Sequence, residues 1–363
     1  MPNRRTFMTG AAAAAIGSSM SWADAGMPSY LAAARMPDQS YRLFGLDQDV
    51  RPLFSRPLPA RGHAAAGHPT RPEAIAFARR PGTYALVVNC VTASTVAKLS
   101  APAERHFYGH GVFSEDGARL YTTENAFEIG EGRIGIWAAD DGYARVGEFR
   151  SGGIGPHDIT RLPDTDILVV ANGGIDTHPD TGREKLNIPT MRPNLTYLST
   201  TGEMLDQVEL PPEMHQNSIR HLSVRQDGLV AFGCQWQGDL ADVPPLIGTH
   251  RRGQPPALFK QPDPEHRALT GYIGSIAFSA DGRTIGFTAP RGDRAEFFNL
   301  DTGWQPALMA EDVCGIAPSR HGHVLTTGLG VTGHANSDLV EKAIWGSWDN
   351  HMVSIQAELS PTS

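Results

Sequence analysis

The sequence predicts an all-β protein, a single β-propeller of seven blades. Three observations point to this fold: a weakly repeated hairpin, a composition rich in turn formers and few helical patterns. Each repeat is an apolar run, a polar turn that often holds Asp-Gly, and a second apolar run, which is the pattern of a β-hairpin. Successive copies start about 40 to 60 residues apart, as expected for four-stranded blades with loop insertions. The 39 glycines and 27 prolines are spread along the 363 residues, which fits many short strands joined by turns.

The repeated hairpins can be followed in order along the chain. The earliest copy starts at His63 and is expected to pair with the run 84–88. A degenerate late copy starts at Cys314, and the clear copies between them begin at His110, His157, His221 and Ser275.

The two ends of the chain are expected to share one blade. Apolar runs begin at Tyr30 and Tyr41, and the late strand from His351 can pair with them and close the ring. This count gives seven blades, with a six- or eight-bladed ring as the main alternative. The best short helical candidate is Asp338–Ile344.

The first 25 residues have the organisation of a twin-arginine signal peptide. Arg4 and Arg5 precede a short, mildly apolar run, and 23–25 (Ala-Asp-Ala) supplies a cleavage site of small residues. The apolar run is too short for a membrane anchor. We therefore expect export to the periplasm in folded form, with the propeller over 26–363; an ordinary secretory signal with a chance arginine pair is the alternative.

Charge and cysteine content narrow the function further. The formal net charge of −8 argues against nucleic acid and anionic lipid as partners, and no later segment is long and apolar enough to span a membrane. Cys90, Cys234 and Cys314 are an odd number, which leaves at least one thiol unpaired in an oxidising compartment, and the apolar runs around Cys90 and Cys234 predict buried free thiols. Cys314 is also a candidate thiolate ligand.

A histidine register runs through the repeats. Counting back seven residues from the end of each hairpin turn gives His63, His110, His157 and His221, followed by Ser275 and Gly315. Because the innermost strands of a propeller all start at one face, equivalent positions form a ring around the central channel. The four histidines should therefore line one arc of a channel mouth.

These histidines are candidate metal ligands. Neutral imidazoles bind copper, zinc, iron and nickel, and one added carboxylate would favour iron, so we expect iron or copper with Glu124 as the carboxylate. A polar channel lining held by carbonyls and water is the alternative. The insertion 173–193 is expected to cover the channel mouth as a lid. Residues expected on this lid or in contact with the metal ligands are Asn125, Asn172, His178, Arg220 and Gln235.

Several segments resemble the DUF1513 family, and together they span nearly all of the chain after residue 25. They are 61–63, 77–83, 106–113, 151–157, 171–174, 178–186, 191–193, 218–221 and 272–275. The resemblance implies a propeller of the YVTN type, similar to those of quinoprotein amine dehydrogenases and nitrous oxide reductase, with no settled catalytic residues. Genes of the family tend to lie beside imelysin-type and di-haem oxidoreductase genes, which implies periplasmic iron-uptake or di-haem proteins as partners.

Three functions are compatible with these patterns. The first is a non-enzymatic metal-handling protein, iron-associated, with the histidines as its site. The second is a hydrolase or oxidoreductase that uses the same face, although no nucleophile elbow, phosphate loop or His-Glu-x-x-His motif is present. The third is an interaction scaffold, because propellers often bind proteins across one face.

Overall fold

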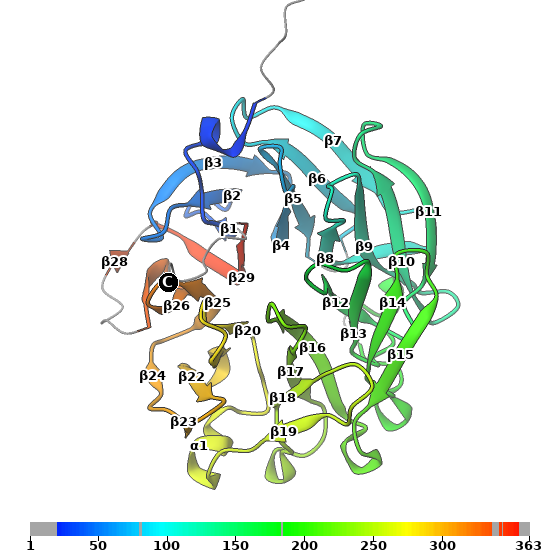
Figure 1. Cartoon of the computed structure of the whole chain (residues 1–363), viewed down its shortest axis with the longest axis vertical. Helices are drawn as coiled ribbons and strands as arrows, with labels where there is room; N and C mark the ends of the chain where they lie inside the picture. Colours follow the sequence, from blue (N-terminus) through cyan, green and yellow to red (C-terminus); the bar gives the residue numbers. More distant parts are fainter. Residues whose placement is uncertain (1–19, 80–81, 183, 336–340, 343, 356–363) are drawn as a thin grey trace, which may run out of the picture.

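The computed structural model describes residues 20–79, 82–182, 184–335, 341–342 and 344–355. In this part of the chain, seven antiparallel sheets surround a central pore, which confirms the seven-bladed propeller (Figure 1). The seven innermost strands, β4, β8, β12, β16, β20, β25 and β29, each pack beside the next around the pore. Among the described residues, no helix combines the length and apolarity that a bilayer crossing requires.

The strands follow the chain blade by blade. The first blade holds β29 (Ser347–Ser354), β1 (Tyr30–Arg35), β2 (Tyr41–Leu46) and β3 (Pro52–Leu58). The second holds β4 (Gly62–Gly67), β5 (Glu73–Ala78), β6 (Tyr84–Asn89) and β7 (Thr95–Ser100). The third holds β8 (Arg105–Phe113), β9 (Arg119–Ala126), β10 (Glu131–Ala138) and β11 (Ala144–Arg150).

The remaining blades repeat this order. The fourth holds β12 (Pro156–Arg161), β13 (Ile167–Asn172), β14 (Asn194–Ser199) and β15 (Met204–Glu209). The fifth holds β16 (Asn217–Val224), β17 (Val230–Trp236), β18 (Ile247–His250) and β19 (Ala257–Phe259). The sixth holds β20 (Ser275–Phe278), β21 (Thr284–Ala289), β22 (Arg294–Asn299), β23 (Gly303–Trp304) and β24 (Leu308–Met309). The seventh holds β25 (Val313–Ser319), β26 (Gly322–Thr327), β27 (Val331–His334) and β28 (Glu341–Lys342).

The ring is closed by the two ends of the propeller. Strand β29 pairs antiparallel with β1, so the last strand of the chain is the innermost strand of the first blade (Figure 1, red beside blue). This confirms the pairing expected for the strand that begins near His351. Because the closing strand comes from the far end of the chain, the pore is complete only when the whole propeller has folded.

One expected strand pairing was wrong, and one expected helix lies partly outside the described residues. Strand β4 pairs with β5, not with the run 84–88, which is β6 and pairs with β5 from the other side. In the helical candidate Asp338–Ile344, residues 338–340 and 343 lie outside the described residues, and Glu341–Lys342 form β28. The α-helix present in the described part of the chain, α1 (Asp263–Ala268), lies between the fifth and sixth blades.

The N-terminal expectation lies mostly outside the described residues. Residues 1–19, with both arginines of the signal pattern, are not described, and 22–25 form a short 3₁₀ helix before β1. The signal peptide, its cleavage and the start of the domain at residue 26 therefore stay predictions.

The core lies in the seams between blades, where side chains from neighbouring sheets interdigitate. The largest cluster joins the fourth, fifth and sixth blades and includes the fully buried rings of Tyr197, Phe232 and Phe287. All three cysteines are free thiols buried in such seams, as predicted for Cys90 and Cys234. Burial raises the pKa of the Cys90 and Cys314 thiols to about 12, so they behave as small apolar groups.

Candidate metal centre in the pore

Five histidines converge in the pore, each from the innermost strand of a different blade. The ring centroids of His63 and His110 are 5.0 Å apart, and those of His157 and His221 are 4.8 Å apart. His351, on the closing strand β29, lies 4.5 Å from His63 and 5.0 Å from His221. The four histidines of the predicted register therefore meet, and the closing strand adds a fifth.

Bulges in the inner strands aim these rings at the pore. In β12 the pairing with β13 skips His157, which therefore has no residue opposite it. In β8 and in β29 three residues lie opposite one residue of the neighbouring strand, and these triplets end at His110 and His351. An extra residue bends a strand and redirects its side chains, so the bulges turn imidazoles out of the sheet plane.

Register shifts also occur in the inner strands of three more blades and are absent from one. The register of β4 shifts across His63, and that of β16 shifts across Arg220, the residue before His221. Strand β20, by contrast, pairs with β21 from Ser275 onward without a shift. The register of β25 shifts across Cys314, so bulges and histidines coincide in five blades and a sixth bulge holds a cysteine.

Close packing of the rings depends on Gly109. This residue has φ +101°, and a Cβ there would lie 2.6 Å from Cδ2 of His63. Both the backbone conformation and the space therefore require glycine. The bulge in β8 can approach β4 closely only because this position has no side chain.

Several ring nitrogens in the cluster are buried without a hydrogen-bond partner among the described residues. They are Nε2 of His110, both ring nitrogens of His221 and Nε2 of His351. Buried polar atoms in proteins are almost always satisfied, so an accumulation of such atoms at one point needs an explanation. A shared ligand at that point would supply it.

The opposite ring nitrogens are held by the protein. Nδ1 of His110 lies 3.0 Å from a carboxylate oxygen of Asp158, and Nδ1 of His63 lies 3.5 Å from Asp349. Nδ1 of His157 donates to the carbonyl oxygen of Arg220 at 3.1 Å. Carboxylates or carbonyls behind a histidine fix its tautomer and orientation at metal sites, and leave Nε2 for the ion.

Burial favours the neutral form of four of the five rings. Burial lowers the pKa of His63 to about 4, against the opposing effect of its contact with Asp349. Burial also lowers the pKa of His157, His221 and His351 well below the ordinary value, and the neighbouring rings add to this shift. Neutral imidazole is the form that binds metals.

The carboxylates behind the rings stay ionised. Burial would raise the pKa of Asp158, but the adjacent His110 holds it below its usual range. The pKa of Asp349 is likewise held well below its usual range, because contacts with His63, Arg79 and Arg61 outweigh its burial. The site therefore has negative charge behind His110 and His63.

The candidate ligand atoms form two overlapping triads. One consists of His63, His110 and His351, and the other of His110, His157 and His221. Within each triad the ligand atoms lie within 4.8 Å of one another, and His110 belongs to both. Three imidazoles with an open position are a common arrangement for a reactive or exchangeable ion.

A cavity of about 310 Å³ opens directly onto this cluster. Its walls include His63, His157 and His221, whereas His110 and His351 are not among its lining residues. The cluster therefore has one side that faces the cavity and one that faces protein.

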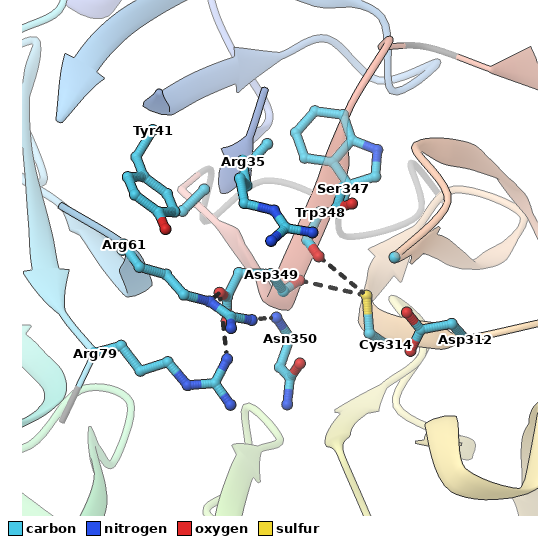
Figure 2. Close-up of a pocket in the computed structure, with 14 residues that line it drawn as sticks. Arg35, Tyr41, Arg61, Arg79, Asp312, Cys314, Ser347, Trp348, Asp349 and Asn350 are labelled. Atoms are coloured by element: carbon cyan, nitrogen blue, oxygen red, sulfur yellow. Dashed lines mark hydrogen bonds and ion pairs between the residues drawn. The ribbon is translucent and has the colours of Figure 1, made fainter. Parts of the chain in front are cut away.

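A second, smaller cavity of about 220 Å³ lies beside the first. Figure 2 shows it around Arg61, Arg79 and Asp349, where Arg61 Nε contacts the Asp349 carboxylate at 2.6 Å. Arg79 and Asn350 line both cavities. Asp349 thus connects the wall of this second cavity to the ring of His63.

Comparison with known proteins decides the family of this chain. Residues 56–355 match the family described as "Protein of unknown function (DUF1513)". The chain belongs to the DUF1513 family. No curated protein matches it. Among solved structures, it is similar to a chain of hydrazine synthase from Kuenenia stuttgartiensis, with a TM-score of 0.62 and 11% identity over 83% of this chain and 90% of that chain. At this identity the likeness concerns the fold alone.

Glu124 does not join the histidines in this DUF1513 propeller. Its carboxylate is fully buried and forms a two-pronged ion pair with Arg145, at 2.7 and 2.9 Å. It lies on β9, the second strand of its blade, where it also accepts a hydrogen bond from Thr122. The proposed carboxylate ligand therefore serves the packing of the third blade.

The other predicted residues divide between the cavity and the blades. Arg220 and Gln235 line the cavity beside the cluster. Asn172 is bonded to Ser151 and Asn194 inside the fourth blade, and Asn125 donates to the Thr177 carbonyl.

Two further candidates lie away from the pore ligands. His178 is near Glu128, with 3.2 Å between Nε2 and the carboxylate. Cys314 directs its Sγ to the carbonyls of Thr326 and Asp349 and is in neither triad.

Sequence reasoning missed three residues of the cluster. His351 escaped because its strand is followed by no hairpin turn from which to count. Asp158 follows His157 directly, and Asp349 precedes His351 by two residues. A search for carboxylates adjacent to register histidines would have found Asp158.

Proposed function

We propose that this DUF1513 propeller binds a first-row transition-metal ion in its pore and handles that metal without turning over a substrate. One observation carries the proposal: His110, His221 and His351, from three blades, each have a buried ring nitrogen without a hydrogen-bond partner among the described residues, and their ring centroids lie 4.8 to 6.4 Å apart. The carboxylates of Asp158 and Asp349 behind His110 and His63 give the arrangement that supports metal-bound imidazoles elsewhere.

A polar pore lining held by protein groups alone explains the same residues less well. Each buried polar atom left without a partner costs roughly 1–3 kcal/mol. The cluster has such atoms on His110, His221 and His351. A lining held only by protein carbonyls would satisfy the rings, as Ala277 does for His323 in the seventh blade.

The donor set bears on which metal binds. With Glu124 paired to Arg145, the candidate ligands are all imidazoles, a set that suits copper, nickel, zinc and ferrous iron. Affinity of such a set is expected to rise from Fe²⁺ to Cu²⁺. In the cell, the metal that binds also depends on which ion is available. The neighbouring genes associated with the family support iron.

The proposed place of action is the periplasm. The twin-arginine pattern at Arg4 and Arg5 supports export after folding, which would let an ion be enclosed in a finished pore before export. Iron-uptake or di-haem proteins of that compartment are the proposed partners.

Metal analysis of the purified protein tests this function. Elemental analysis should find close to one ion per chain after loading and desalting, and a variant with all five pore histidines changed to alanine should retain none. His178→Ala, on the exposed loop beside Glu128, is the matched control and should keep the ion. Equal metal content in the five-histidine variant and the control would refute the proposal.

An enzyme that uses the same face is the second candidate. It is favoured by the cavity of about 310 Å³ against His63, His157 and His221, because a metal with an open coordination position can activate water or a carbonyl. Turnover of lactone or redox substrates that is lost in His157→Ala would support it over the non-enzymatic function.

A further inference from the structure

The two histidine triads of the pore differ in their access to the cavity of about 310 Å³. His157 is half-buried and lines this cavity together with His221 and His63. His110 and His351 are buried and are not among its lining residues. The cavity-side triad, which consists of His110, His157 and His221, is therefore the one that an ion arriving from the cavity meets first.

The other triad depends on the closing strand β29. This strand supplies His351 as a ligand and Asp349 as the carboxylate beside His63. The members of this closing-strand triad, His63, His110 and His351, are all buried. By contrast, β8, β12 and β16 of three successive blades supply the cavity-side triad. The closing-strand triad is therefore the more enclosed of the two, and it is complete only once the ring has closed.

Carboxylates stand behind two of the three closing-strand ligands. Asp158 lies 3.0 Å from Nδ1 of His110. Oδ1 of Asp349 faces Nδ1 of His63, while its Oδ2 accepts a hydrogen bond from Arg61 at 2.6 Å. A carboxylate behind a ligand imidazole fixes the ring and raises its basicity, and its loss typically costs roughly 10- to 100-fold in metal affinity.

The cavity-side triad has weaker support behind its rings. His110 is common to both triads, so the difference lies in the other two ligands. Nδ1 of His157 donates to the backbone carbonyl of Arg220, and His221 has no hydrogen-bond partner among the described residues. A neutral partner raises the basicity of a ligand less than a carboxylate does. We therefore expect an ion to be held less tightly here than in the closing-strand triad.

His110 serves only one of the two triads at a time. Its Nδ1 faces Asp158, and its buried Nε2, which has no hydrogen-bond partner in the described part of the chain, is the nitrogen left for an ion. An imidazole nitrogen offers a single lone pair and so binds one metal. Two ions therefore cannot fill both triads together. A single ion that keeps His110 can pass between them by exchanging its other two ligands.

We infer that the pore holds one ion in either of two positions, a cavity-side position for entry and exit and a closing-strand position for retention. The inference rests on the proposed metal function and adds a route to it. An ion from the cavity binds the cavity-side triad, then exchanges His157 and His221 for His63 and His351 while His110 stays bound. The step is a ligand exchange without electron transfer, so it needs no co-reactant. Release follows the same path in reverse, and the closing-strand triad controls how long the ion stays.

Loading and release of Zn²⁺ by the intact protein test the two positions. Zn²⁺ is the probe because it has no redox chemistry and accepts imidazole ligands, and exchange with a chromophoric chelator measures both rates. In His351→Ala only the cavity-side triad remains, so Zn²⁺ should still bind but leave at least about tenfold faster than from the unmodified chain. In His157→Ala only the closing-strand triad remains, so Zn²⁺ should still bind but load and leave at least about tenfold more slowly.

A second variant in each triad distinguishes loss of a ligand from a local folding defect. His63→Ala should behave as His351→Ala does, and His221→Ala as His157→Ala does. The double variant His157→Ala/His351→Ala leaves neither triad complete and should hold no zinc. His178→Ala, outside both triads, is the control and should match the unmodified chain.

The outcomes separate this inference from the metal proposal. Opposite changes in release rate for the two pairs of variants would support two positions. Loss of zinc from both variants of one triad, or equal rates in all four single variants, would overturn the two positions and leave the metal site standing. An unmodified chain that binds no zinc or other first-row ion would overturn the proposed function, and this inference with it.

Discussion

Two arcs of the propeller share one architecture and differ in what they present to the pore. The first arc consists of the first to fifth blades, and each of these blades contributes one histidine to the cluster. The second arc consists of the sixth and seventh blades, which have Ser275 and Gly315 at the matching position. The buried histidine of this second arc, His323 on β26, instead donates from Nε2 to the Ala277 carbonyl at 3.1 Å. The comparison shows that a histidine becomes a candidate ligand through its place on an inner-strand bulge.

The largest expected difference between the arcs is the effect of a pore substitution on metal affinity. His110→Ala removes the residue common to both triads, so affinity should fall by more than the roughly 100-fold that loss of a supporting residue can cost. Ser275→Ala, at the equivalent position of the other arc, should leave affinity unchanged. Competition with a chromophoric chelator measures both, and equal affinities would remove the distinction between the arcs.

The next effect concerns the carboxylate behind the central histidine. Asp158→Asn keeps the shape of the side chain but removes its charge beside His110 Nδ1, so metal affinity should fall roughly 10- to 100-fold. Asp281→Asn is the matched change in the second arc, where Asp281 accepts a hydrogen bond from Ser279 in the β20–β21 turn. It should not alter affinity. The same chelator competition applies, and a loss of equal size in both variants would point to a general charge effect.

The arcs also differ in how far sequence alone could describe them. The hairpin repeat predicted the blades and the convergence of His63, His110, His157 and His221, because equivalent positions in a propeller lie at equal height. It could not predict the bulges, which depend on how each inner strand meets its neighbour in three dimensions. Strand β12 has a bulge and β20 has none, and no local sequence motif distinguishes the two strands in this respect.

The wrong assignment of Glu124 and the missed ligand His351 both result from contacts between distant parts of the chain. Glu124 was assigned to the pore from its place near the end of the second strand, but that strand lies one step away from the pore, and Arg145 on β11 pairs with the carboxylate across the blade. His351 was seen as the start of the closing strand and not as a ligand, because its blade is assembled from both ends of the chain. Long-range pairing set both outcomes.

A smaller effect is expected from the glycine that lets β8 approach β4. Gly109→Ala should destabilise the fold by about 1–3 kcal/mol through its left-handed backbone and should also weaken metal binding, because the new Cβ displaces His63. Gly322, in the second arc, has a similar φ of +106° with nothing within 4 Å of the Cβ position. Gly322→Ala should therefore cost stability without affecting metal. Urea unfolding and metal titration of both variants separate strain from displacement, and unchanged metal affinity in Gly109→Ala would show that the ring of His63 is not held by this contact.

The smallest effect is a pH dependence that belongs to the second arc. Burial lowers the pKa of His323 to about 4, so this ring stays neutral in the folded state while the unfolded chain takes up a proton below about pH 6.5. The unfolded state then binds more protons, and the free energy of unfolding falls as pH decreases from about 6.5 toward about 4, by about 1 kcal/mol between pH 7 and pH 5.5. His323→Gln, whose amide can still donate to the Ala277 carbonyl, should lose this part of the pH dependence, whereas exposed His321→Gln should keep it. Urea unfolding of metal-free protein at both pH values makes the comparison, and an identical pH slope for His323→Gln and the unmodified chain would mean that this buried ring titrates as it does in the unfolded state.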